Sequence, residues 1–142
     1  MYERIVVGTD GSERSLSAIE HAAQLAELCG AELHVVQGCG TPIFVNPYGG
    51  DTTGVHLPDL MQAVADELEP LKSRLESRGI DVHTHVLPEG GADAIVDLAR
   101  SIEGDLIVVG NRGMTGVRRV LGSVPNTVAH HAPCAVLIVQ TT

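Results

Sequence analysis

With 142 residues, the chain has the length of one ordinary domain, and we expect residues 1–142 to form a single one. The formal net charge of −9 at pH 7 argues against nucleic acid or an anionic membrane as a partner, because both need a basic surface. Hydrophobic residues make up 44% of the chain, with two Tyr, one Phe and no Trp, which indicates an aliphatic core typical of a parallel sheet covered by helices.

Short apolar runs alternate with stretches of helical periodicity. Residues 4–9 predict a strand, and a helix follows between a candidate N-cap at Ser12 and a stop at Gly30. A second strand is expected at residues 31–37. The segment 38–54 is rich in Gly, Pro and Thr and predicts a long loop.

The middle of the chain continues the alternation. Leucines and valines at helical spacing between residues 57 and 79 predict an amphipathic helix, with a kink or a break at Pro70. Residues 81–87 alternate apolar residues with His83 and His85, which predicts a strand near the sheet edge with one solvated face.

The last part of the chain predicts a helix at 92–102, a strand at 105–110, a helix at 123–131 and a strand at 134–140. Five strands separated by four helical crossovers predict an α/β fold. We expect an open, doubly wound, five-stranded parallel sheet of order 3-2-1-4-5, with helices on both faces.

The segment after the fourth predicted strand, residues 108–126, reads VVGNRGMTGVRRVLGSVPN. In a doubly wound sheet, ligands bind beyond the carboxyl ends of the strands where the strand order reverses, and there this segment would face GTDGS, residues 8–12. Glycines let backbone N–H groups approach an anion, and Ser123 at the start of a helix would extend such a cradle. The pattern therefore predicts a polyphosphate site, and the alternative is that the glycines only form turns.

Three of the nine basic residues fall in this segment. Arg112 lies within the glycine turn and is the best candidate for a phosphate contact. Arg118 and Arg119 could also contact phosphate, but a solvated, salt-bridging loop is the favoured interpretation for them.

GTDGS after the first strand, with GNRG and, eight residues later, GSV after the fourth, closely resembles the universal stress protein family over essentially the whole chain. The ATP-binding branch of that family carries Gly-x2-Gly-x9-Gly-(Ser/Thr) at this place. This chain matches it with Gly110, Gly113, Gly122 and Ser123, although eight residues instead of nine separate the second and third glycines. The resemblance implies ATP as the ligand, with magnesium entering only through the nucleotide.

The resemblance also implies a role for each part of the site. Asp10 would contact the adenosine, Gly8 and Thr9 would line the same wall, and the main chain at Val35 would meet the adenine edge. From the residues alone, Asp10 could equally form an Asx turn and Val35 could be ordinary core. The residues implied to hold the ribose and phosphates are Gly110, Asn111, Arg112, Gly113, Met114, Thr115, Gly116, Gly122, Ser123 and Val124.

The last strand ends the sheet with an apolar edge, and such edges need a partner. Members of the family typically pair this strand across a two-fold axis, so the resemblance implies a homodimer.

The expected function is that of an adenine-nucleotide-responsive regulator of the stress response. Cyclic AMP is an alternative ligand, because a single phosphate needs fewer donors from the loop. Further alternatives are a slow ATPase, an autophosphorylating switch with Ser123 or Thr115 as acceptor, and an interaction module without a ligand.

No catalytic residue and no metal site are predicted. His83 and His85 share a strand face, but no cysteine or carboxylate completes a set at ligand spacing. The chain shows no signal-peptide pattern and no apolar stretch long enough to span a membrane. Its three cysteines are widely spaced, which indicates reduced thiols and a cytoplasmic location.

Overall fold

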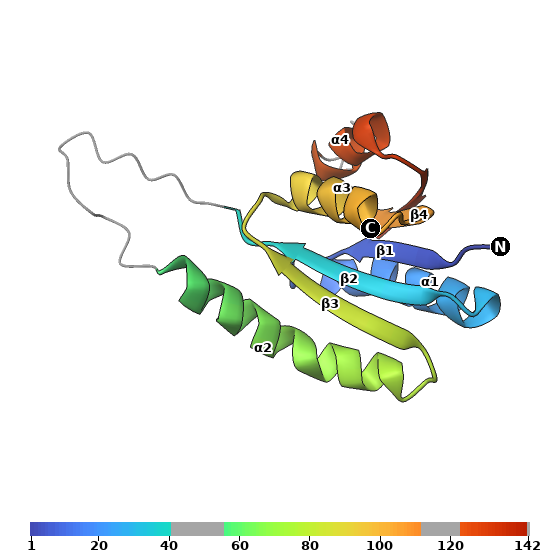
Figure 1. Cartoon of the computed structure of the whole chain (residues 1–142), viewed down its shortest axis with the longest axis horizontal. Coiled ribbons are helices and arrows are strands. Elements are labelled where there is room, and N and C mark those ends of the chain that lie inside the picture. Colours follow the sequence, from blue (N-terminus) through green and yellow to red (C-terminus); the bar gives the residue numbers. More distant parts are fainter. Residues whose placement is uncertain (41–55, 112–122, 142) are drawn as a thin grey trace.

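The fold is a parallel sheet with helices on both faces. A computed structural model describes residues 1–40, 56–111 and 123–141 (Figure 1). The elements in these ranges are β1 (Arg4–Gly8), α1 (Glu13–Cys29), β2 (Glu32–Gly38), α2 (Leu57–Glu76), β3 (Asp81–Leu87), α3 (Gly91–Ser101), β4 (Leu106–Gly110), α4 (Ser123–His131) and β5 (Ala135–Val139).

The sheet confirms the predicted order. Its strands lie in the order β3-β2-β1-β4-β5, and every neighbouring pair is parallel. In the centre, Val7 of β1 lies opposite Val35 of β2 on one side and Val108 of β4 on the other. Because all strands run the same way, their carboxyl ends meet at one edge of the sheet, and the strand order reverses between β1 and β4.

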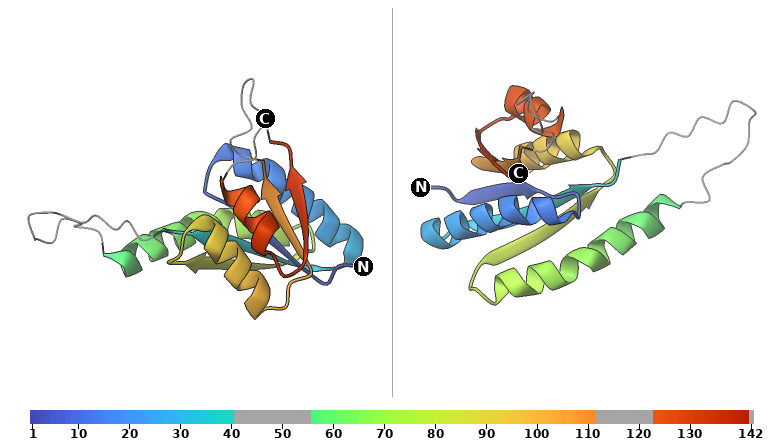
Figure 2. Two further views of the ribbon diagram at one scale, coloured as in Figure 1. Left: turned by 90° about the horizontal axis from the view of Figure 1, so that it is seen from above. Right: turned by 180° about the vertical axis from the view of Figure 1, so that it is seen from behind.

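The two faces of the sheet carry separate cores. α1 and α2 cover one face, and α3 and α4 cover the other (Figures 1 and 2). Because side chains alternate along a strand, Ile5 and Val7 pack toward α1, while Val6 between them packs toward α3. On α1 the buried residues are mostly small, which brings this helix close to the sheet: Ala18, Ile19, Ala22, Ala23 and Ala26.

Two helix signals had different outcomes. Gly30 ends α1 in the left-handed conformation with φ 64°, as predicted. A break at Pro70 is wrong, since α2 runs without interruption from Leu57 to Glu76. Pro70 cannot donate to the carbonyl of Asp66, but both residues lie on the exposed side of the helix, where water can replace that bond.

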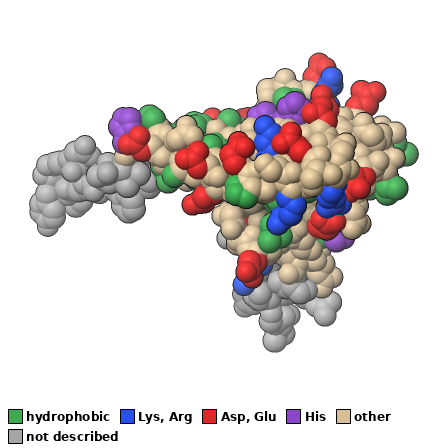
Figure 3. Space-filling view, turned by 90° about the horizontal axis from the view of Figure 1, so that it is seen from below, with side chains coloured by type: hydrophobic (Ala, Val, Ile, Leu, Met, Phe, Trp, Pro, Cys, Tyr) green, Lys and Arg blue, Asp and Glu red, His purple; other side chains and the backbone are tan. Residues whose placement is uncertain are grey.

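Acidic side chains are spread over the face shown in Figure 3. Two acidic residues of α1 bind Arg78, in the turn after α2: Arg78 donates to Glu20 at 2.8 Å and to Glu27. The hydrogen bond from Arg78 is the main cause that lowers the pKa of Glu20. Within the described ranges, no helix is both long enough and apolar enough to cross a bilayer.

Gly38 lets the turn before α3 pass directly over the end of β2. A Cβ at this position would lie 2.5 Å from the carbonyl oxygen of Glu89 and 2.9 Å from the carbonyl carbon of Gly90. Cys39 N–H donates to the Leu87 carbonyl at 2.8 Å, which holds the two backbones together. Neither backbone can move aside without breaking this contact.

Gly38→Ala is therefore expected to lower the free energy of unfolding by about 1–3 kcal/mol, the usual cost of overpacking. Urea unfolding followed by circular dichroism would measure the change. Gly90→Ser is the matched control, because a Cβ at Gly90 meets nothing within 4 Å and Ser is favoured at the N-cap position that Gly90 occupies. Equal destabilisation by both variants would contradict the close-approach argument.

Candidate functional site

A cavity of about 200 Å³ lies at the carboxyl ends of the strands, where the strand order reverses. Packed protein interiors contain few voids larger than a water molecule, so a cavity of this size is a candidate ligand site. Strand ends, the residues after them and the first turns of three helices line it: Gly8, Thr9, Asp10, Arg14, Ser15, Val36, Gly38, Gly91, Ile95, Val109, Gly110, Val124, Pro125 and Thr141.

The turn after β1 is held by hydrogen bonds of its own. Thr9 N–H donates to the Val36 carbonyl at 2.9 Å and so extends the pairing of β1 with β2. The Asp10 carboxylate accepts from the backbone N–H of Ser12 at 3.0 Å and from its hydroxyl at 2.5 Å, which is an Asx turn. Gly11 adopts φ 82°, which a glycine supplies without strain. The turn therefore has a defined shape before any ligand arrives.

The ends of β4 and β5 are joined through Asn111. Its backbone N–H donates to the Val139 carbonyl at 2.9 Å, and its side-chain oxygen accepts from the backbone N–H of Thr141 at 2.8 Å and from the Thr141 hydroxyl at 3.1 Å. Asn111 is buried. The Thr141 side chain also packs over Gly110, where a Cβ would lie 2.9 Å from its methyl carbon.

The described walls of the cavity offer two kinds of surface. Val36, Ile95 and Val109 provide apolar area, and Arg14 is the only basic side chain among the described lining residues. Val124, in the first turn of α4, adds a helix N-terminus, whose backbone N–H groups favour anions. An apolar wall beside a cation and a helix N-terminus can hold a ligand with a flat apolar part and an anionic part.

The structure brings five of the predicted site residues together at this cavity: Gly8, Thr9, Asp10, Gly110 and Val124. Asn111 directly follows Gly110, and Ser123 directly precedes Val124, but neither lines the described cavity. Val35 is fully buried against α1 on the opposite face of the sheet. The other predicted residues lie outside the described ranges: Arg112, Gly113, Met114, Thr115, Gly116 and Gly122, with Arg118 and Arg119.

Sequence reasoning did not select several lining residues. Val36 lines the cavity, because one step along the strand from Val35 moves the side chain to the other face. The contact predicted for the main chain at Val35 stays a prediction. Arg14 and Thr141 carried a usable signal, since each follows closely after a strand whose carboxyl end faces the site. The remaining ones are contributed mainly by helix turns and the strand ends: Ser15, Gly38, Gly91, Ile95, Val109 and Pro125.

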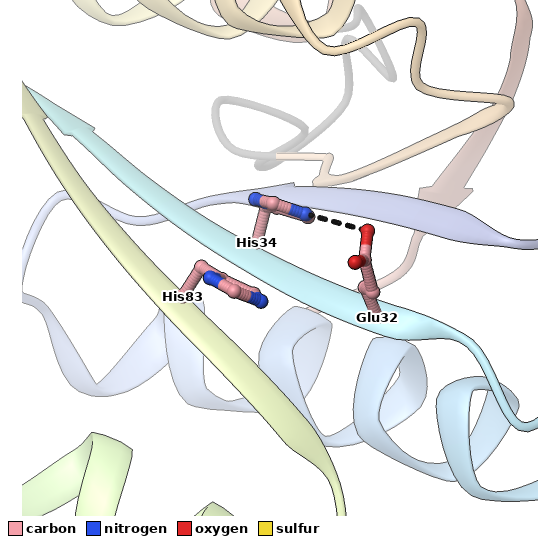
Figure 4. A group of neighbouring side chains, drawn as sticks. All are labelled: Glu32, His34 and His83. Atoms are coloured by element: carbon pink, nitrogen blue, oxygen red, sulfur yellow. Dashed lines mark hydrogen bonds and ion pairs between the residues drawn. The ribbon is translucent and has the colours of Figure 1, made fainter.

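A second group of polar side chains lies on β2 and β3 (Figure 4). His34 lies opposite His83 in the strand register, and their rings stack with centroids 4.6 Å apart. Nδ1 of His34 is 2.9 Å from Nε2 of His85, and Nε2 of His34 is 3.4 Å from a carboxylate oxygen of Glu32. His34 is buried, with 6% of the residue exposed, whereas His83 and His85, on the face predicted to be solvated, are half-buried.

Burial controls the protonation of two of these imidazoles. It lowers the pKa of His34, although the nearby Glu32 carboxylate opposes the change. It also lowers the pKa of His85, and the imidazoles of His34 and His83 lower it further. Both side chains are therefore neutral at pH 7, since an unperturbed imidazole has a pKa of about 6.5.

Sequence comparison identifies known relatives of the chain. A sequence model of the universal stress protein family matches residues 1–140. A universal stress protein of Methanocaldococcus jannaschii is 34% identical over 99% of this chain and 83% of its own length.

Solved structures with the same fold include nucleotide complexes. One universal stress protein, in complex with cAMP, is 30% identical with a TM-score of 0.77, and the match covers 99% of both chains. Another, from Archaeoglobus fulgidus and in complex with dAMP, is 28% identical with a TM-score of 0.69 over 98% of both chains.

From the lowered pKa values of His34 and His85 we predict a loss of stability in mild acid. An unfolded histidine binds its proton near pH 6.5, whereas the lowered pKa values of His34 and His85 delay protonation of the folded chain. The unfolded state then holds more protons, so the free energy of unfolding falls as the pH drops below about 6.5. His85→Gln removes one of the two groups. Its free energy of unfolding is therefore expected to fall less between about pH 7.5 and about pH 5.5 than that of the wild type.

Urea unfolding at the two pH values, with a chelator present, would measure this difference. His21→Gln is the control, because His21 is an exposed histidine on α1. It should show the same drop as the wild type. A His85→Gln variant that keeps the full drop would show that burial of this imidazole does not control the acid sensitivity.

Proposed function

Because the chain belongs to the universal stress protein family, we propose that it binds an adenine nucleotide in the cavity between β1 and β4. The observation that carries the proposal is the cavity at the reversal of strand order, in a chain whose solved relatives include complexes with cAMP and with dAMP. Its apolar wall of Val36, Ile95 and Val109 suits the purine ring, and Arg14 with the start of α4 suits the phosphates.

We further propose ATP as the ligand, which would make the chain a member of the ATP-binding branch. The Gly110, Gly113, Gly122 and Ser123 pattern supports this choice. In this proposal Asp10, Gly8 and Thr9 form the adenosine side of the site, and the segment from Gly110 to Val124 forms the phosphate side. Magnesium would enter with the nucleotide phosphates.

Cyclic AMP is the second candidate. The spacing of eight residues between Gly113 and Gly122, one fewer than in the family pattern, favours a ligand with fewer phosphates. A solved relative at 30% identity is a cAMP complex, which supports the same choice.

The proposed biological role is that of a cytoplasmic regulator whose state follows the adenine-nucleotide supply during stress. Slow ATP hydrolysis, or phosphate transfer to Ser123 or Thr115, would make the protein a switch instead of a sensor. If the protein binds no nucleotide, it would act as an interaction module. Release of phosphate over a long incubation separates the first case from simple binding.

We propose that β5 pairs with its counterpart in a second copy, which forms a homodimer. β5 is one of the two edge strands of the sheet, and its residues before Val139 are exposed or half-buried. Leu137, at its centre, is 36% exposed. An apolar edge strand of this kind is stabilised by pairing.

Calorimetric titration of the nucleotide-free protein with ATP–magnesium, and separately with cyclic AMP, tests the ligand. We expect saturable binding of ATP. In Arg14→Ala, loss of one charged contact to phosphate should weaken ATP binding about tenfold, which corresponds to about 1.4 kcal/mol. Adenosine binding, which needs no phosphate contact, should change less.

Arg74→Ala is the control for this titration, because Arg74 lies in the last turn of α2 and does not line the cavity. It should bind ATP as the wild type does. Tighter binding of cyclic AMP than of ATP would favour the second candidate. Binding of neither nucleotide would overturn the proposed function.

Leu137→Lys tests the dimer. It places a charge in the middle of the edge that the proposed interface covers, so the molar mass from light scattering should fall from that of a dimer to that of a monomer. Leu28→Lys is the control, since Leu28 is 83% exposed near the end of α1 and should leave the mass unchanged. A monomeric wild type would refute the interface.

A further inference from the structure

We propose that Glu32, His34 and His83 bind a divalent transition-metal ion of the zinc class on the face of the sheet that carries α3. The three residues come from two neighbouring strands, β2 and β3, and the proposed site is separate from the residues that line the nucleotide cavity. One ligand atom from each residue can be chosen so that all three lie within 4.8 Å of one another.

Strand register explains why these side chains meet. His34 and His83 are paired directly across β2 and β3, and Glu32, two residues before His34, projects from the same face. Figure 4 shows the His34 and His83 rings one above the other, with the Glu32 carboxylate beside His34. Since α2 packs on the opposite face of β3, the ligand atoms lie on the side away from that helix.

The donor set has the chemistry of a zinc-class site. Imidazole nitrogen and carboxylate oxygen are ligands for Zn²⁺, and imidazole also suits Cu²⁺ and Ni²⁺. Tetrahedral Zn²⁺ places neighbouring ligand atoms about 3.3 Å apart, because each bond is about 2.0–2.1 Å long. The stacked rings of His34 and His83, with 11° between their planes, must rotate to reach this geometry.

Two charged neighbours shape the site. Asp81 Oδ1 lies 3.1 Å from Nε2 of His83, a nitrogen that is buried and makes no hydrogen bond within the described residues. Asp81 thus adds negative charge at the rim. Arg4 Nε lies 3.3 Å from the Glu32 oxygen that also faces His34, and a bound cation would replace this half-exposed ion pair.

His85 is the positioning residue of the proposed site. Its Nε2 lies 2.9 Å from Nδ1 of His34, so it can accept the Nδ1–H bond of that ring. A histidine that binds a metal through one nitrogen usually donates the other N–H to such a partner, which fixes the tautomer and the orientation of the ring. His34 would then present Nε2, the nitrogen nearest to Glu32, to the ion.

Zinc binding to the full chain, without a purification tag and after removal of metal and nucleotide, tests the proposal. Competition with a chromogenic chelator should show one Zn²⁺ bound per chain in saturable fashion. Glu32→Gln and His83→Asn should each weaken binding at least tenfold. Both residues are partly exposed, so these variants are expected to fold, and circular dichroism checks this. His21→Gln, which alters an exposed histidine on α1, should bind Zn²⁺ as the wild type does.

The visible spectrum of bound Co²⁺ separates the ligands from the positioning residue. His85→Gln should weaken binding about tenfold but leave the Co²⁺ spectrum of the wild type, because the ligand set is intact. His83→Asn should change the spectrum. Absence of saturable Zn²⁺ binding, or unchanged affinity in either Glu32→Gln or His83→Asn, would overturn the proposed site. The experiment contains no nucleotide, so its result is independent of the proposed function.

Discussion

The strand order reverses between β1 and β4: after β1 the chain continues to β2 on one side, and after β4 it continues to β5 on the other side. The helices that follow these two strands therefore lie on opposite faces of the sheet. α1 packs with Ile5 and Val7 on one face, and α4 packs beside α3 on the other. Their first turns therefore separate at the carboxyl ends of β1 and β4 and leave a space that neither helix fills. The cavity forms at this place because the strand order reverses there. Thr9, Gly110 and Thr141, which lie at or just after the carboxyl ends of their strands, line it.

Glycines beside this cavity serve the packing of the fold as well as access to a ligand. A Cβ on Gly8 would lie 2.3 Å from the end of the Ile95 side chain, and a Cβ on Gly110 would lie 2.9 Å from the Thr141 methyl group. Gly8 thus lets α3 pack closely over β1, and Gly110 lets the end of β5 close over β4. The turn interpretation and the ligand interpretation of the glycine-rich segments are compatible, because close backbone packing defines the walls against which a ligand would bind.

Periodicity and turn residues were sufficient to predict the strands, the helices and the strand order, because each depends on short-range patterns and on the right-handed crossover. Properties set by three-dimensional contacts were not predictable in the same way. Pro70 was expected to break α2, yet the solvated side of that helix tolerates it. Val36 was not selected as a lining residue, because sequence alone does not say which face a buried strand residue takes when both faces are apolar. His34 was overlooked because its neighbours His83 and His85 are about fifty positions away in the chain and meet it only through strand pairing.

The polar group on β2 and β3 follows from an uneven covering of the sheet. On the α3 side, that helix packs mainly against β2 and β1, and on the other side α2 covers β3. Residues of β3 that point to the α3 side can therefore be polar, as His83 and His85 are. His34 is next to them but largely buried, so its two nitrogens need partners, which His85 and Glu32 provide. Because these partners come from the chain itself, the fold does not require an ion at this place. A metal bound there would add to a stable sheet, and its affinity would depend on the small ring rotations that bring the ligand atoms together.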